Sequence, residues 1–276
     1  MADTAARALK PGIELIGVEA ELYPSMKNVV DGQHGRIGGD TLAEGIAVKD
    51  YSKTQPQVTF INGGSGAQAT TLENPSANFF RFNTEGGQWM VGLGKAAMAK
   101  GYKRVMVIAE DYAFPYSQVQ GFMTEYCKGG GKVPVKAWVP LGGKDYSSVI
   151  ARIPKDVDAL LLVLGGADAV NFLNQYENAG GDKPILGGSI TVSQDVLNYR
   201  GKKRDSLVGT LSAGPLADAY DGAEWKKFVA AYKSATGKMP TTYAMASYDA
   251  ARVIDMAITK AGKTDSKSIN AAIGEL

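Results

Sequence analysis

The sequence has few of the residues on which catalytic and metal sites are usually built. Its 276 residues contain one cysteine, Cys127, and one histidine, His34. A single cysteine excludes an internal disulfide framework, and these two residues cannot by themselves form a zinc site. A Ser-His-Asp relay needs its base beside the nucleophile, and His34 lies in a polar stretch typical of a solvated loop. We therefore predict no catalytic residue, no metal ligand and no cofactor.

Long hydrophobic runs and an excess of one charge are also missing. The longest strongly apolar run, 159–164, ends at Gly165 and is far shorter than the roughly 20 residues of a membrane span. The first residues lack the basic region and apolar stretch of a signal peptide, although an exported protein whose signal has been removed would look the same. The 30 Lys and Arg nearly balance the 28 Asp and Glu, which argues against nucleic-acid binding driven by bulk charge.

What the sequence does contain is an alternation of short apolar runs with amphipathic stretches, which predicts an α/β fold with mainly parallel sheets. The length suggests about two domains, and the hydrophobic content of 45% allows a sizeable core. The strands are expected at 12–18, 57–62, 78–82, 104–109, 135–139, 157–164, 184–187 and 206–212. Helices are expected at 41–53, before Gly101, around 119–126, at 149–153, 169–179, around 225–232, 243–261 and 266–273.

Five turns between these elements are candidate ligand contacts, because open α/β sheets bind ligands beyond the carboxyl ends of their strands. Glycines there let the backbone approach a ligand closely, Thr41, Ser65 and Ser189 can form hydrogen bonds, and Tyr112 and Phe114 can wall an apolar group. The turns are 38–41, 63–67, 110–114, 165–168 and 187–189.

Each of these features also has a purely structural interpretation. Glycine pairs after strands are common turn chemistry, and Thr41 and Asp168 are equally suited to cap helices. Tyr112 and Phe114 fit a core as well as a binding wall. Cys127, which follows Tyr126 on an apolar helix face, is expected to be an inert buried thiol.

One motif points toward an enzyme. The segment Gly64–Ala69 fits the G-x-G-x-x-A fingerprint of dinucleotide-binding folds. That fingerprint expects a second strand about 20 residues later that ends in an acid for the ribose. Here the next strand ends Arg81-Phe82-Asn83, with Glu85 beyond it, so the signal is weak.

Taken together and in order, the motifs resemble the type I periplasmic solute-binding proteins of ABC transporters, in the branched-chain amino-acid (leucine/isoleucine/valine) group. They extend over roughly residues 38–260, and the ordered set is more specific than any one of them. The motifs are Phe60–Ala67, Asn78–Asn83, Gly101–Val105 leading into Glu110–Tyr112, Lys144–Ser148, Gly165–Ala169, and Tyr243 with Tyr248–Ala251.

This resemblance implies a two-lobed type I periplasmic binding protein fold, with parallel sheets flanked by helices and a ligand cleft between the lobes. Lobe one would take residues 1–83 and 217–276, and lobe two residues 84–216, with hinge closure on the ligand. The resemblance also implies a first strand and helix before Ile13 and further strands after Leu276, so lobe one is expected to be incomplete. The resemblance also implies a non-enzymatic, monomeric, periplasmic receptor that delivers a small solute to the membrane subunits of an ABC permease.

The resemblance places the ligand contacts after the strand ends. Members that bind α-amino acids hold the ammonium group with an acid in the turn where this chain has Ser189, and a buried ammonium without a carboxylate is costly. An aromatic acid, an amide or another small organic anion therefore fits better than an ordinary amino acid. Tyr112 and Phe114 would wall it, and N–H groups of the 64–67 turn would hold its carboxylate. The predicted ligand-binding residues are Asp40, Thr41, Gly64, Ser65, Gly66, Ala67, Tyr112, Phe114, Gly165, Gly166 and Ser189.

Two alternatives remain open at this stage. One is a nucleotide-dependent α/β enzyme that uses the Gly64–Ala69 turn. The other is a sensory ligand-binding domain of the same fold.

Overall fold

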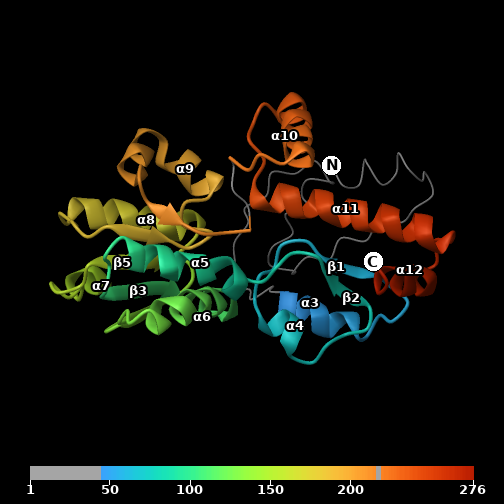
Figure 1. The fold of residues 1–276 in the computed structure, drawn as a ribbon, viewed down its shortest axis with the longest axis horizontal. Coiled ribbons are helices and arrows are strands. Elements are labelled where there is room, and N and C mark those ends of the chain that lie inside the picture. The colour runs from blue at the N-terminus through green and yellow to red at the C-terminus, as the bar shows by residue number, and fades with distance from the viewer. Residues whose placement is uncertain (1–44, 216–218) are drawn as a thin grey trace. The chain divides into compact units, whose positions relative to one another are not determined.

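The computed structural model describes residues 45–215 and 219–276. These form two compact units (Figure 1): the first contains residues 45–65, 69–83 and 245–276, and the second residues 66–68, 84–215 and 219–244. Residues 219–244 group with the second unit, whereas the prediction of two lobes assigns them to lobe one. The predicted strand 12–18 and the start of the predicted helix 41–53 lie outside the described residues.

The second unit is built on a five-stranded sheet in which every neighbouring pair of strands is parallel, in the order β4-β3-β5-β6-β7. All residues of the central strands β3 and β5 are buried, as their near-continuous apolar sequences predict for a sheet covered on both faces. The strands are β3 (Val105–Glu110), β4 (Lys136–Val139), β5 (Ala159–Val163), β6 (Ile185–Gly187) and β7 (Leu211–Ser212).

The last strand is shorter than expected. The sequence predicts a strand over 206–212, but residues up to Leu207 belong to a 3₁₀ helix, η1 (Gly201–Leu207), and only Leu211–Ser212 pair with β6. The helix before it, α9 (Gln194–Arg200), was not predicted.

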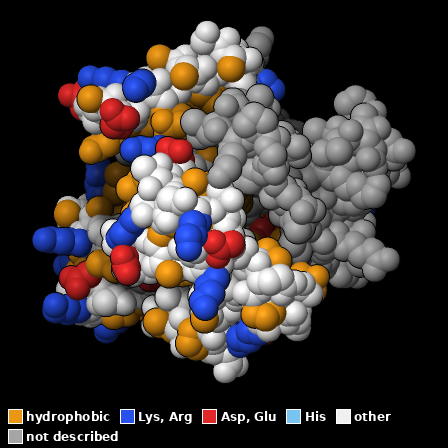
Figure 2. Space-filling view, turned by 90° about the vertical axis from the view of Figure 1, so that its right-hand side faces the viewer, with side chains coloured by type: hydrophobic (Ala, Val, Ile, Leu, Met, Phe, Trp, Pro, Cys, Tyr) orange, Lys and Arg blue, Asp and Glu red, His pale blue; other side chains and the backbone are white. Residues whose placement is uncertain are grey.

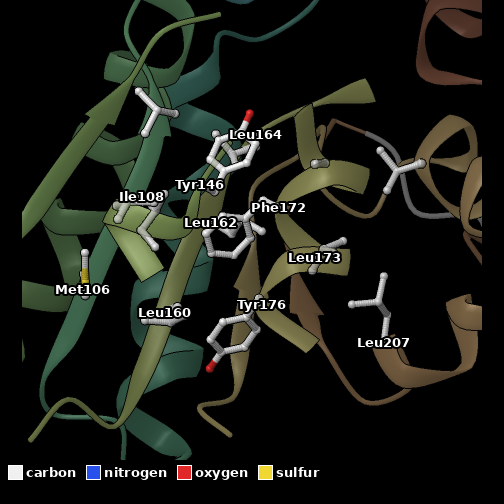
Figure 3. Packing of buried hydrophobic residues seen from close by; sticks show 14 of the residues in the cluster. Met106, Ile108, Tyr146, Leu160, Leu162, Leu164, Phe172, Leu173, Tyr176 and Leu207 are labelled. Atoms are coloured by element: carbon white, nitrogen blue, oxygen red, sulfur yellow. The ribbon is translucent and has the colours of Figure 1, made fainter. Parts of the chain in front are cut away.

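Alternate residues of β3 and β5 pack on opposite faces of the sheet, because successive side chains of a strand point to opposite sides. On one face, Met106, Ile108, Leu160 and Leu162 meet Tyr146, Phe172, Leu173 and Tyr176 (Figure 3). The helices on this side are α7 (Ser147–Ala151), α8 (Gly166–Asn178) and α9. On the other face, Val105, Val107, Leu161 and Val163 pack against α5 (Gly86–Ala99) and α6 (Ala113–Lys128).

The helices α5 and α6 approach each other through glycines. A Cβ atom at Gly121 would lie 1.9 Å from the carbonyl oxygen of Gly87, and one at Gly94 would lie 2.4 Å from that of Phe122. Helix α5 begins at a capping box in which the Glu85 carboxylate accepts the N–H groups of Gly87 and Gln88. The close packing fixes the position of α6, which carries several residues of the candidate site.

The first unit contains a two-stranded parallel sheet, β1 (Phe60–Asn62) and β2 (Phe79–Arg81). Its helices are α3 (Gly45–Ser52), the four-residue α4 (Ala69–Leu72), most of α11 (Thr242–Ala261) and α12 (Ser266–Ile273). A small core of Val253, Ala257, Ile269, Ala272 and Ile273 holds α11 and α12 together. The helices predicted at 243–261 and 266–273 are thus confirmed.

The remaining described helix, α10 (Ala223–Thr236), ends at Gly237, whose φ of +71° is the left-handed conformation common at helix ends.

On the face drawn in Figure 2, Lys and Arg side chains are interspersed with Asp and Glu. Within the described residues, no helix is both long enough and apolar enough to cross a membrane.

Candidate functional site

The turn after β1, in the first unit, is closed by a side chain of its own strand. The Oδ1 atom of Asn62 accepts the N–H groups of Gly64 and Ser65 at 3.1 and 2.8 Å, and its Nδ2 donates to the Ser65 carbonyl at 2.9 Å. These two N–H groups were predicted to hold a ligand carboxylate. In this structure they are already paired within the turn.

The same turn does not open a helix of the kind that a dinucleotide site uses. The helix that follows, α4, has only four residues. The N–H of Gln68, just before this helix, is already occupied because it donates to Ser117 Oγ at 2.9 Å. A pyrophosphate site relies on free N–H groups at the start of a helix. The geometry of the turn therefore gives no support to the dinucleotide interpretation of Gly64–Ala69.

In the second unit, aromatic side chains gather after the carboxyl end of β3. The rings of Tyr112 and Phe114 lie 6.4 Å apart, and Phe114 meets Trp89 edge-on at 5.7 Å. All three residues are half-buried. A Cβ atom at Gly66 would lie 2.5 Å from the Phe114 ring and 2.7 Å from that of Trp89, so only glycine lets the backbone lie against this aromatic group.

The turn after β6 presents Ser189, and a residue of α6 holds it. Gln118, which is fully buried, donates from Nε2 to Ser189 Oγ, and its Oε1 accepts the Ser189 N–H at 3.2 Å. A Cβ atom at Gly188 would lie 2.8 Å from Gln118 Oε1. The glycine before Ser189 is therefore what allows the glutamine to reach it.

The turn after β5 is held by a carboxyl group at the end of β3. Glu110 Oε1 accepts the N–H of Gly165 at 2.9 Å, and the Glu110 carboxyl is also hydrogen-bonded by the Tyr112 side chain. Gly165 lies beside the residue that follows Ser189, because a Cβ atom there would be 2.9 Å from Ile190 Cδ1. The next glycine, Gly166, has a φ of +46°, a conformation that side chains disfavour.

Two carboxyl groups are buried at this edge of the sheet. The pKa of Glu110 is raised from 4.5 to about 7, chiefly by burial and to a smaller extent by nearby Asp168, against the lowering effect of the hydrogen bonds from Gly165 and Tyr112. Burial also raises the pKa of Asp168, whose Oδ2 accepts the Gly142 N–H at 2.7 Å. Asp168 thus ties down the loop after β4, and the cap of α8 is Gly165.

The second unit brings five of the predicted residues to the carboxyl edge of its sheet: Gly66, Tyr112, Phe114, Gly165 and Ser189. Ala67 is fully buried beside Gly66, and Gly166 follows Gly165. Gly64 and Ser65 belong to the first unit, and Asp40 and Thr41 lie outside the described residues.

Three residues that hold these turns in place are not among the predicted site residues: Asn62, Glu110 and Gln118. The role of Asn62 could have been predicted, since an Asn side chain before two glycines commonly bonds to the backbone of the turn that follows.

The expectation that Cys127 is a buried thiol was wrong, because the thiol is exposed. Neighbours on a helix lie about 100° apart around its axis, so a residue next to the buried Tyr126 can face outward.

Metal binding finds no support in the part of the chain that the structure describes. No group of three or more His, Cys, Asp or Glu side chains lies close enough together there to hold an ion.

Comparison with known proteins matches this chain to one family. The sequence pattern of the periplasmic binding proteins matches residues 29–276. The Leu/Ile/Val-binding protein homolog 6 of Brucella melitensis is 26% identical over 194 residues, which cover 66% of this chain and 48% of the relative. The chain therefore spans about half the length of the curated relatives it matches.

Two solved structures show the same fold. An ABC transporter substrate-binding protein from Sphaerobacter thermophilus has a TM-score of 0.79 at 25% identity, covering 100% of this chain and 80% of that one. A solute-binding protein of an ABC transporter from R. palustris, in complex with benzoate, has a TM-score of 0.79 at 19% identity, covering 99% and 79%. These are binding proteins and not enzymes. Because the family pattern covers most of the chain, this chain belongs to the periplasmic binding protein family.

Proposed function

We propose that this chain is an extracytoplasmic receptor that captures a small organic solute for uptake by an ABC transporter. The observation that carries the proposal is the arrangement at the carboxyl edge of the second unit's sheet. There the half-buried rings of Tyr112 and Phe114 share one edge with the turns at Gly165 and Ser189. Ligand sites of this kind combine apolar walls with a few placed polar groups.

The solute class follows from the side chains present. Aromatic rings offer a wall for a planar apolar group, while Ser189 stands where an acid would be needed for an ammonium group. We propose an aromatic acid or an aromatic amide as the solute, ahead of an ordinary α-amino acid. The benzoate complex of the R. palustris protein supports an aromatic acid as a ligand that this fold can hold.

The predicted contacts act together in this proposal. Gly66, Ala67, Gly165 and Gly166 would let the backbone approach the solute, Tyr112 and Phe114 would flank it, and Ser189 would form a hydrogen bond with it. Gly64 and Ser65 remain proposed contacts from the first unit, in a turn that Asn62 holds, and Asp40 and Thr41 remain proposed contacts as well.

The wider assignments belong to the same proposal. We propose that the chain has no enzymatic activity, acts as a monomer and meets the membrane subunits of its permease outside the cytoplasm. The division into lobe one (1–83 and 217–276) and lobe two (84–216), with closure on the solute, also remains a proposal.

Ligand-dependent thermal unfolding of the purified chain tests this function. The panel contains benzoate, cinnamate, benzamide, leucine and NAD. A ligand at 100 times its Kd that binds only the native state stabilises it by about 2.7 kcal/mol, so an aromatic acid or amide is expected to raise the Tm by several degrees. A response to NAD alone, or to no acid or amide, would overturn the proposal.

Two variants locate the response. Phe114→Ala removes a wall of the proposed site and is expected to weaken benzoate binding about tenfold or more. Tyr220→Ala removes an aromatic ring that is 64% exposed and outside the predicted set, and it is expected to leave the affinity unchanged. Equal losses in both variants would place the ligand elsewhere.

A further inference from the structure

The contact between Gln118 and Ser189 fixes the direction of every hydrogen bond in it. A backbone N–H can only donate, so the amide atom that meets the Ser189 N–H must be the oxygen of Gln118. The other amide atom is then the NH₂ group, which can only donate. The Ser189 hydroxyl that faces it must therefore accept.

The consequence is that the hydroxyl of Ser189 has its own hydrogen left to donate in another direction. A serine hydroxyl has one donor and two acceptor positions, and Gln118 occupies an acceptor position. Because Ser189 is half-buried at the edge that carries the proposed site, the hydrogen is available to a bound solute. Ser189 thus keeps its donor free while Gln118 takes one of its two acceptor positions.

The glutamine has no freedom to exchange its two amide atoms. It is 0% exposed, its Cγ lies 3.2 Å from the position of a Cβ atom on Gly86, and its Oε1 lies 2.8 Å from that position on Gly188. Turning the amide over would place the NH₂ group against the Ser189 N–H, donor against donor. The packing and the hydrogen bonds therefore select the same orientation.

We propose that Gln118 is a specificity-determining residue that acts through Ser189 and selects solutes with a hydrogen-bond acceptor, such as a carboxylate or carbonyl oxygen, over solutes with an ammonium group. This inference rests on the proposed function. A carboxylate that reaches Ser189 gains a charge-assisted hydrogen bond. An ammonium group that reaches the same place can donate only to the one acceptor position that Gln118 leaves on the hydroxyl, and its other hydrogens gain no partner there, which is costly in a buried site.

The test measures the ratio of affinities for benzoate and benzylamine, which share a ring and differ at the polar end. Isothermal titration at pH 7.5 is carried out on the wild-type chain and on Gln118→Met, Gln118→Glu and Ser189→Ala. Methionine fills a similar volume without an amide, so it releases the Ser189 hydroxyl and adds no charge. We expect Gln118→Met to lower the benzoate preference about tenfold, the worth of one hydrogen bond to a charged group.

Gln118→Glu reverses the contact. A carboxylate can only accept, so it takes the Ser189 N–H and the Ser189 O–H and turns the hydroxyl's lone pairs toward the solute. The preference is expected to fall further than in Gln118→Met. Since the new charge itself repels benzoate, the double variant Gln118→Glu/Ser189→Ala separates the two effects: the part that acts through the hydroxyl is absent there.

The outcomes separate this inference from the function on which it rests. If the wild-type chain binds no aromatic acid or amide, the proposed function fails. If it binds benzoate but Gln118→Met keeps the wild-type ratio, the function stands and the role of Gln118 is overturned. If the Gln118 variants do not fold, Ser189→Ala decides the point, because a preference unchanged in that variant also overturns the inference.

Discussion

Two turns with the sequence Gly-Gly-Ser follow parallel strands in this chain, one after β1 and one after β6. In the first, Asn62 closes the turn from two and three residues away, by accepting the N–H groups of Gly64 and Ser65. In the second, Ser189 is held by Gln118, which is 71 residues away in the sequence and lies on helix α6. The same three residue types are thus held by a neighbour in the sequence in the first turn and by a residue from a distant helix in the second.

The turn after β5 belongs with the second kind. Its Gly165 N–H is held by Glu110, 55 residues away at the end of β3. A turn closed by a residue of its own strand, such as Asn62, is expected to keep its geometry when more distant parts of the unit are damaged. Turns held from a distance take their geometry from the helices and strands that carry their partners, so damage to those elements should reach the turns.

Gly121→Ala is expected to lower stability the most, because it disrupts the packing between α5 and α6 that positions Gln118. Its new Cβ atom would lie 1.9 Å from the carbonyl oxygen of Gly87, and a backbone atom cannot move aside alone. We expect a loss of about 3 kcal/mol or more in the free energy of unfolding, together with weaker benzoate binding. Urea denaturation and titration calorimetry measure the two effects.

The matched control is the same substitution at an open position. Gly92 lies in the interior of α5, is exposed, and has nothing within 4 Å of its added Cβ. Gly92→Ala is expected to stabilise the chain by roughly 0.5–1 kcal/mol, since alanine favours the helix. A loss of stability at Gly121 together with a small gain at Gly92 would tie the loss to the contact with Gly87; a harmless Gly121→Ala would contradict the described packing.

The second effect concerns Glu110, whose pKa of about 7 in the folded chain exceeds its ordinary 4.5. Between these pH values the native state binds the proton more tightly than the unfolded chain does, so this group's contribution to stability falls as pH rises. The shift corresponds to about 3 kcal/mol. Glu110→Gln keeps an oxygen for the Gly165 N–H and removes the titration.

The comparison between Glu110→Gln and the parent chain isolates this group from other titrating residues, including Asp168. We expect the parent to lose stability relative to the variant between about pH 5 and pH 8, measured by urea denaturation at four pH values. Parallel pH profiles for the two proteins would show that Glu110 is already ionised at low pH in the folded chain.

The smallest effect is expected at the locally closed turn. Asn62→Ala leaves the N–H groups of Gly64 and Ser65 without their partner, at a cost of about 1–2 kcal/mol. Asn62→Asp keeps an acceptor for both N–H groups but sets a carboxylate oxygen against the Ser65 carbonyl, so it is expected to keep their exchange slow while still losing some stability. Hydrogen exchange should show faster exchange at Gly64 and Ser65 in Asn62→Ala, with the second unit unchanged. Faster exchange at Ser189 would erase the distinction between the two turns.

Much of the fold could be predicted from the sequence, because it depends on patterns that neighbouring residues set. The apolar runs 104–109 and 157–164 predicted central strands, and β3 and β5 are buried throughout. The helix at 266–273 has the predicted bounds. Less was predictable where the pattern is short: α4 and α9 were missed, and the strand expected over 206–212 begins at Leu211.

The class of the fold, the resemblance to the family and the turns at which strands end could all be predicted from the amino-acid sequence. Hydrophobic periodicity indicates which faces of helices and strands are buried, and glycines indicate where the chain turns. The three-dimensional structure was needed to show that Gln118 contacts Ser189, that Glu110 holds Gly165, and that the Cys127 thiol is exposed. The physical reason is that hydrogen bonding and burial depend on which atoms are in contact in space, and many of these contacts are between residues that are far apart in the sequence.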